Sequence, residues 1–410
     1  MTNRIKIRLC AVAAWVLVCA LTLTSCSTVV SASDDLMKGI SPSNVSGKSA
    51  DDAFLTAQTA FALSLLQGCV ASDANENVLL SPLSVQMALA MTANGAKGDT
   101  LAEMETVLGG GLPIAELNQY LYTTRTDLSD DWHLANSIWF RSAVEKDFLQ
   151  TNADYYGADA YKAAFDDQTV QDINKWVETH TGGLIDRIID RIDDSSMMYI
   201  INALAFDAAW QTGYADGSMF AGNFTTEEGV HRTVKMMASR EDTYLKDTNA
   251  TGFVKPYAGG RYAFVALVPD RGTSLDAYIA GLTVDRVRAL LNTASGTEPV
   301  TVHLPQFSID YGVTLNGVLS AMGMPTAFTD RADFSGMGQE NLCIGDVAHK
   351  TRIKVDENGT KAGAVTSVDI KTMSAGPENT VVLDRPFVYM IIDTQTGIPA
   401  FIGTVTDISN

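Results

Sequence analysis

The sequence has few positive charges for its length, and this excludes one class of partner. It holds 29 Lys and Arg residues against 48 Asp and Glu residues, a formal net charge of −19 over 410 residues. Proteins that bind nucleic acids place Lys and Arg along the phosphate backbone, so no nucleic-acid partner is expected. The negative charge is typical of a soluble protein that anionic surfaces repel.

Signatures of catalysis are missing as well. The chain has neither a Gly-x-Ser-x-Gly nucleophile motif nor a His-Glu-x-x-His zinc motif, and its five histidines are scattered. The triplet Gly47-Lys48-Ser49 resembles the end of a phosphate-binding loop, but Pro42 stands where that loop needs its first glycine. We therefore expect no enzymatic activity, no cofactor and no metal site.

Cysteine is scarce, which limits disulfide and zinc chemistry. Of the five cysteines, Cys10, Cys19 and Cys26 lie near the N-terminus, which leaves Cys69 and Cys343 for the rest of the chain. Their spacing fits no zinc or redox motif. We expect two buried thiols, with a single disulfide between them as the alternative.

The N-terminal 25 residues have the pattern of a signal peptide. Three basic residues are followed by an apolar run from Leu9 to Leu23, which is too short and wrongly flanked for a transmembrane helix. The run ends in Leu23-Thr24-Ser25-Cys26, which resembles the lipobox of bacterial lipoproteins. The resemblance implies cleavage before Cys26 and a lipid anchor on its thiol at the extracellular face of the membrane. The alternative is an ordinary secreted protein that loses Cys26.

The remainder is expected to form a short tether and one domain. Residues 26–50 are rich in Ser, Asn, Gly and Asp without periodicity, which predicts a flexible tether. Residues 51–410 contain no linker and no repeat. Helical patterns occur at 52–71, 82–94, 99–108, 145–156, 169–183, 274–292 and 313–323. Strand patterns occur at 131–140, 197–206, 262–270, 300–307, 342–355, 387–393 and 399–408. Helices early and strands late predict an α+β fold.

One segment, "VDENGTKAGAVTSVDIKT" at residues 355–372, alternates like a strand but continues into the loop-like "MSAGPENT". The residues on its small, largely apolar face are Thr360, Ala362, Ala364, Thr366, Val368 and Ile370. A long strand attached to an exposed loop has no evident place in an ordinary sheet.

Four stretches together resemble the serpin family in order and spacing. They are "NVLLSPLSVQMALAMTANGAKGDT" (77–100), "INALAFDAAW" (201–210), "AHKTRIKVDENGT" (348–360) and "LDRPFVYMIIDTQTGIPAFIGTV" (383–405). The resemblance covers about residues 52–410. It implies a serpin fold with three β-sheets, about eight or nine helices and an exposed reactive-centre loop at about 357–384. It also implies a metastable native state.

The resemblance implies a function for the unusual segment. A serine protease cleaves the loop as a substrate and becomes acylated, and the cleaved loop then inserts as a new strand of the large sheet. The hinge enters the sheet first and needs small residues on its inward face. The residues that match the family's hinge are Glu357, Gly359, Thr360, Ala362, Ala364 and Thr366. Ser81, Ser84, Asn202 and His349 match the polar cluster beneath the opening strands, called the shutter. Trp210 matches the aromatic residue where the loop first enters, called the breach.

The position of the reactive bond stays open between two counts. Counting forward from Gly359 by the family's spacing gives Met373-Ser374, whereas counting back from Pro386 gives a bond near Ala375. Both residues fit the apolar pocket of an elastase-like protease. Lys371 is the alternative and would indicate a trypsin-like target. One departure from the family is Gln306, which stands where a lysine commonly faces the residue that matches Glu357.

The expected function is therefore inhibition of elastase-like serine proteases by a monomeric cell-surface protein. A non-inhibitory serpin that acts as a binding module is the second hypothesis, and the small hinge residues argue against it. A hydrolase or solute-binding lipoprotein is the third, which the missing catalytic motifs disfavour.

Overall fold

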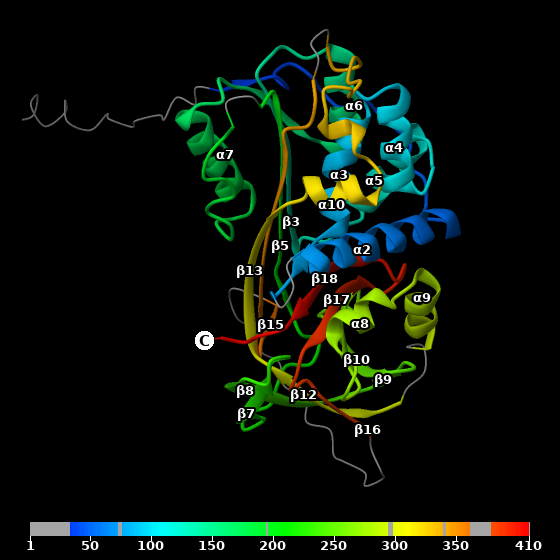
Figure 1. The fold of residues 1–410 in the computed structure, drawn as a ribbon, viewed down its shortest axis with the longest axis vertical. Coiled ribbons are helices and arrows are strands. Elements are labelled where there is room, and N and C mark those ends of the chain that lie inside the picture. Colours follow the sequence, from blue (N-terminus) through cyan, green and yellow to red (C-terminus); the bar gives the residue numbers. More distant parts are fainter. Residues whose placement is uncertain are drawn as a thin grey trace, which may run out of the picture. The chain divides into compact units, whose positions relative to one another are not determined.

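The computed structural model describes residues 33–72, 76–193, 196–293, 298–338, 342–360 and 379–409. These residues belong to one compact unit that begins at Ser33. Its strands form three sheets, and helices lie against both faces of the largest one (Figure 1). This is the α+β architecture with three sheets that the sequence predicted.

The large sheet contains the segments that matter for function. Its order is β1-β4-β3-β5-β14-β15-β6, and β13 pairs with the other edge of β14. The bounds are β1 (Asp34–Asp35), β3 (Trp132–Phe140), β4 (Asp159–Lys162), β5 (Met198–Phe206), β6 (Ala208–Ala209), β13 (Phe307–Thr314), β14 (Asp346–Val355) and β15 (Gly359–Thr360).

Two central strands of this sheet, β5 and β14, run parallel to each other. Their pairing extends from Tyr199 opposite Asp346 to Ala205 opposite Arg352. We call this pairing the seam. All nine residues of β5 are buried, because helices cover both faces of the sheet there, and this explains the nearly continuous apolar run in its sequence.

The other two sheets complete the core. The six-stranded sheet contains β2 (Leu79–Leu80), β9 (Thr243–Lys246), β10 (Ala250–Pro256), β11 (Tyr262–Pro269), β17 (Phe387–Asp393) and β18 (Pro399–Val405). The four-stranded sheet contains β7 (Met219–Thr225), β8 (His231–Glu241), β12 (Val300–Pro305) and β16 (Asn379–Val382). Most buried apolar side chains belong to one continuous core, which includes the inner face of the large sheet.

The helices begin and end where local chemistry favours it. They are α2 (Asp52–Ser72), α3 (Pro82–Ala93), α4 (Gly98–Gly109), α5 (Ile114–Thr126), α6 (Lys146–Tyr156), α7 (Asp167–His180), α8 (Leu275–Ala280), α9 (Val284–Thr293) and α10 (Asn316–Met322). In α3, Ser81 caps the first turn by accepting from the Ser84 amide, and Pro82 occupies the first helical position. Helix α2 is long and apolar enough to cross a membrane, but more than half of it is buried, as in a core helix.

Helix α7 packs on the outer face of the large sheet through a second, smaller core. This core joins Ile173 and Trp176 of α7 to Trp139 of β3, Ile201 of β5 and Ala348 of β14. It therefore spans the seam from outside, whereas α3 lies against the inner face.

Several sequence-based boundaries were wrong. The helix expected at 274–292 is two helices, since Gly281 ends α8 and α9 begins at Val284. The helix expected at 313–323 begins only at Asn316, because residues up to Thr314 extend β13. Helix α5 and strands β7 to β10 were not predicted; in α5 only four of thirteen residues are buried, so its apolar periodicity is weak.

The expected flexible tether over residues 26–50 is also wrong for its described part. Strand β1 pairs with the edge strand β4, and the Lys48 amide donates to the Gln119 carbonyl. The Lys48 ammonium also forms an ion pair with Glu116. The segment from Ser33 is therefore part of the domain, because it finds backbone and charged partners that a composition-based prediction does not see. The signal peptide and Cys26 lie outside the described residues.

Candidate functional site

The end of β14 turns back on itself and begins a new strand. After Val355 the chain turns at residues 356–358, and β15 then pairs antiparallel with β14 through Val355 and Thr360. The other edge of β15 pairs with β6, which follows β5 in the chain. A Cβ atom at Gly359 would lie 2.2 Å from the Ala208 carbonyl oxygen, so only glycine permits this close approach.

Thr360 corrects the expectation that the hinge lies outside the sheet. Its side chain is fully buried, and its hydroxyl shares a hydrogen bond with the Tyr257 hydroxyl. Trp210 stacks on Tyr257 with ring centroids 4.6 Å apart and donates from Nε1 to the Asp356 carbonyl at 2.8 Å. The predicted aromatic residue at the breach therefore contacts the turn, and the hinge residues Gly359 and Thr360 are already strand residues.

Glu357, at this turn, has two partners. Gln306 donates from its side-chain amide to one carboxylate oxygen, and the Lys235 ammonium lies 3.6 Å from the other. Two groups therefore take the place of the lysine that commonly faces this glutamate. They are the neutral side-chain amide of Gln306, which directly precedes β13, and the ammonium of Lys235 on β8. Both charged side chains are partly exposed, so the ion pair contributes little to stability.

A buried ion pair lies behind Trp210, and sequence analysis missed it. The Lys255 ammonium of β10 is 2.7 Å from the Glu241 carboxylate of β8, and both side chains are more than nine-tenths buried. The ammonium also faces the rings of Trp210 and Tyr214, at 5.3 and 4.6 Å from their centroids. Loss of one partner would leave an uncompensated buried charge beside Trp210, which is strongly destabilising. The two partners are far apart in sequence and carry no motif.

The four predicted shutter residues come together under the seam. The Ser81 amide donates to Nε2 of His349 at 3.1 Å, and Nδ1 of His349 lies 2.7 Å from Oδ1 of Asn202. The Asn202 amide donates to the Ser84 hydroxyl and, at 2.6 Å, to Oδ1 of Asn136. Asn136 of β3 was not predicted, although its register opposite Asn202 would have indicated it once β3 and β5 were paired.

His349 is neutral and has one tautomer in this cluster. Its Nε2 accepts from a backbone amide, so Nδ1 carries the hydrogen and donates to Asn202. Burial without a nearby carboxylate lowers the pKa of His349 to about 3. His349 and Asn202 are register partners across the seam, so this hydrogen bond joins the two strands directly.

Acidification should therefore weaken the native state through His349. The unfolded chain takes up a proton on this residue near pH 6.5, whereas the folded chain does so only near pH 3, so stability falls as pH drops through that window. Between pH 6.5 and 5 the loss is ~2 kcal/mol, at about 1.4 kcal/mol per pH unit. Chemical denaturation of wild type and His349→Gln at both pH values measures it. An equal pH dependence in the two proteins would contradict this account of His349.

The structure describes only some of the remaining predicted residues. Outside the described residues lie Cys26, Ala362, Ala364, Thr366, Lys371, Met373, Ser374 and Ala375. Cys69 is buried and Cys343 is half-buried, where burial raises the pKa of its thiol. Within the described part of the chain no disulfide joins them. The groups of His, Cys, Asp and Glu in that same part include no cluster fit to hold a metal ion.

Comparisons with known proteins agree with this geometry. The family model "Serpin (serine protease inhibitor)" matches residues 56–408. A leukocyte elastase inhibitor of Bos taurus is 28% identical over 371 residues, covering 85% of this chain and 98% of that protein. The crystal structure of tengpin, a thermophilic serpin, in its native state has a TM-score of 0.88 at 46% identity, covering 92% of this chain and 100% of that chain.

The latent state of tengpin is less similar, with a TM-score of 0.78 at 45% identity over 88% of this chain and 100% of that chain. As a whole, the fold is thus more similar to the native state than to the latent one. The family match covers most of the chain. This chain belongs to the serpin family.

Proposed function

We propose that this serpin is a suicide-type inhibitor of elastase-like serine proteases. A protease attacks the loop that follows β15 and becomes acylated at the reactive bond. The amino-terminal part of the cleaved loop then inserts between β5 and β14 and carries the acylated protease along before hydrolysis releases it. The protein acts as an inhibitor, not as a catalyst, because the reaction consumes one loop for each protease.

The observation that supports this proposal best is the strand already begun at β15. Gly359 and Thr360 lie between β14 and β6, directly in line with the seam. Continuing the register of Thr360 opposite Val355 would bring Ala362 beside Ile353, Ala364 beside Thr351 and Thr366 beside His349. These β14 residues face the inner side of the sheet, where they are buried. Small inserted side chains are therefore required, and the hinge has them.

The energetics favour insertion once the loop is free. An inserted strand would be antiparallel to both neighbours and would replace the parallel pairing of the seam, which spans seven residue pairs. Residues 361–373 would form ladders on two sides at about 1 kcal/mol net per hydrogen bond. Antiparallel pairing is also slightly the more stable kind. With burial of the inward side chains, the gain is on the order of 10 kcal/mol.

We place the reactive bond at Met373-Ser374. A methionine before the cleaved bond fits the medium-sized apolar pocket of an elastase-like protease. The relative from Bos taurus is named as an inhibitor of leukocyte elastase, which supports this class of target. Cleavage after Ala375 would keep the same target class, whereas cleavage after Lys371 would give a trypsin-like target.

Titration of protease activity tests the target class. Increasing amounts of the protein are incubated with pancreatic elastase or with trypsin, and residual activity is measured against a small substrate. We expect loss of elastase activity at near one-to-one stoichiometry and little loss of trypsin activity. Met373→Arg is the matched variant and should reverse this order. Inhibition of trypsin alone by the wild type would assign the bond to Lys371, and inhibition of neither would favour a non-inhibitory serpin.

We also propose that the protein is held at the outer face of a bacterial membrane by lipid on Cys26. The proposal rests on the sequence from Leu23 to Cys26. Cys26→Ala should move the protein from the membrane fraction to the medium or stop its processing. Wild-type protein found entirely in the medium would contradict the anchor.

A further inference from the structure

A second side-chain contact crosses the seam, on the face opposite the shutter. Tyr199 and Asp346 are the register partners at the far end of the seam from β15. The Tyr199 hydroxyl donates to Oδ2 of Asp346 at 2.7 Å. His349 and Asn202 join the same two strands on the inner face. Besides the backbone pairing, two side-chain hydrogen bonds therefore join the strands, one on each face of the sheet.

The Tyr199 ring is held firmly on the outer face. It is 2% exposed and meets Phe165 edge to face, with ring centroids 5.7 Å apart. Burial, together with the hydrogen bond to Asp346, raises the pKa of Tyr199, so its hydroxyl stays a donor at neutral pH. The hydroxyl also accepts a hydrogen bond from the Asp193 amide at 3.4 Å.

Asp193 belongs to a segment that crosses the outer face after α7. Asn174 of α7 holds this segment by accepting from the amides of Ile188 and Ile189 at 2.9 and 3.2 Å and donating to the Ile189 carbonyl. Tyr199 therefore joins three elements: β5, β14 and the segment that covers them.

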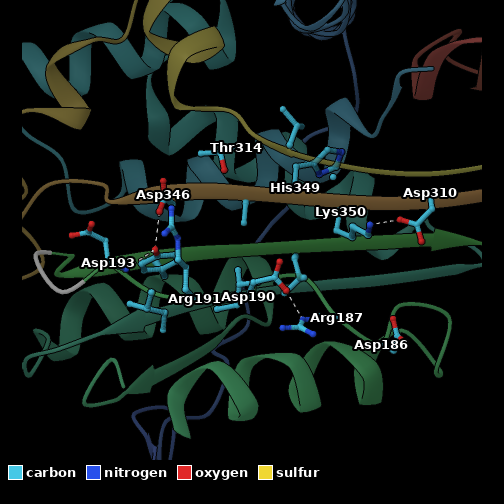
Figure 2. A pocket seen from close by; sticks show the side chains of 17 residues that line it. Asp186, Arg187, Asp190, Arg191, Asp193, Asp310, Thr314, Asp346, His349 and Lys350 are labelled. Carbon is cyan, nitrogen blue, oxygen red and sulfur yellow. Dashed lines mark hydrogen bonds and ion pairs between the residues drawn. The ribbon is translucent and has the colours of Figure 1, made fainter. Parts of the chain in front are cut away.

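A cavity of about 900 Å³ opens between this segment and strands β13 and β14. In Figure 2, Asp346 and Asp193 lie at one end of it, and Lys350 with its partner Asp310 lies at the other. On the outer face of β14, Asp346 and Lys350 line this cavity, whereas Ala348 between them is buried in the second core. The hydrogen bond from Tyr199 to Asp346 is therefore a specific contact at the edge of this cavity.

We propose that Tyr199 and Asp346 are positioning residues that control opening of the seam at its far end; this rests on the proposed function. A strand inserted along the seam moves β5 and β14 apart by about 4.8 Å, one strand spacing, which the hydrogen bond cannot span. Because insertion starts at β15, this is the last cross-strand side-chain contact to break. It slows complete insertion of a strand and is absent from the inserted state.

Annealing of a synthetic peptide with the sequence of residues 361–373 tests the proposal without any protease. The peptide is mixed with the full chain, and its uptake is followed by native gel. We expect Tyr199→Phe and Asp346→Ala to take it up about tenfold faster than wild type, since a hydrogen bond to a carboxylate is worth at least this factor. The double variant should be no faster than either single variant, because both remove the same bond.

Tyr161→Phe is the matched control. Tyr161 belongs to the same second core and its hydroxyl bonds to Asp159 at 3.5 Å, but it lies on β4, away from the seam. Its uptake rate should equal that of wild type. Phenylalanine keeps the ring packing at both positions, so the variants should fold.

The melting temperature of the loop-cleaved form separates control of opening from simple stabilisation. Tyr199→Phe should lower the melting temperature of the intact protein. It should not lower the melting temperature of the cleaved protein, in which the hydrogen bond no longer exists. Two results would overturn the proposal and leave the proposed function intact. One is a peptide uptake rate of Tyr199→Phe equal to that of wild type, and the other is an equal decrease in the melting temperatures of the intact and cleaved forms. If wild type and all variants take up no peptide, the seam does not accept a strand, and both proposals fail together.

Discussion

Cleavage of the loop by a protease that the protein does not trap is expected to raise its melting temperature by about 10–20 °C. The cleaved loop becomes free to insert, and the gain is on the order of 10 kcal/mol. Unfolding entropy of ~2.1 cal/mol/K per residue gives ~0.8 kcal/mol/K for a domain of this size, which converts that gain into this shift. In the intact protein the loop is tied at both ends, to β15 and to β16, so full insertion would first have to detach β16 from β12.

Scanning calorimetry before and after confirmed cleavage measures this shift. Protein preloaded with the annealed peptide is the control, since its seam is already filled and cleavage should change its melting temperature little. An unchanged melting temperature after complete cleavage of the unloaded protein would mean that the native state stores no such free energy.

Ala364→Arg is expected to convert the inhibitor into a substrate. In the register that β15 begins, Ala364 would lie beside Thr351, which is fully buried and donates to the Leu79 carbonyl at 2.7 Å. An unpaired guanidinium in that position costs several kcal/mol. Acylation should be unaffected, because the reactive bond is unchanged. Insertion should slow by two to three orders of magnitude, since 1.4 kcal/mol is a factor of about ten, and hydrolysis should release active protease.

Val365→Arg provides the matched control for this variant. Its register partner would be Lys350, which lines the outer cavity together with the carboxylates of Asp190 and Asp310. An arginine there would have space and would stay hydrated, so inhibition should persist. The stoichiometry of elastase inhibition distinguishes the two variants. Equal stoichiometries would mean that the inserted strand does not follow the register of Thr360 and Val355.

The four shutter residues were predicted from the resemblance to the serpin family, and the structure brings them into one hydrogen-bonded cluster. Ser81 precedes a helix-starting proline, and Asn202 and His349 interrupt apolar strands where a polar side chain needs a partner. Their meeting in one cluster follows from the pairing of β5 with β14. Asn136 lay in an equally apolar strand, but nothing in the sequence aligned it with Asn202.

The wrong or missing predictions have a common physical cause. Tertiary contacts, which the local sequence does not show, determine where these residues lie. Thr360 was expected in the exposed loop because alternation does not show where pairing starts; the Tyr257 hydroxyl is the partner that holds its side chain inside the sheet. Residues 33–50 have the composition of a tether, yet the free edge of β4 and the acidic Glu116 give them partners. Tyr199 and Asp346 are 147 residues apart, and neither belongs to a motif.

One measurement tests the central claim most directly. The protein is mixed with pancreatic elastase, separated on a denaturing gel, and the small released fragment is analysed by mass spectrometry. Acylation followed by insertion predicts a band near the summed mass of protein and protease that survives denaturation, together with a C-terminal fragment that begins at Ser374. A gel that contains only cleaved protein and free protease would contradict the account.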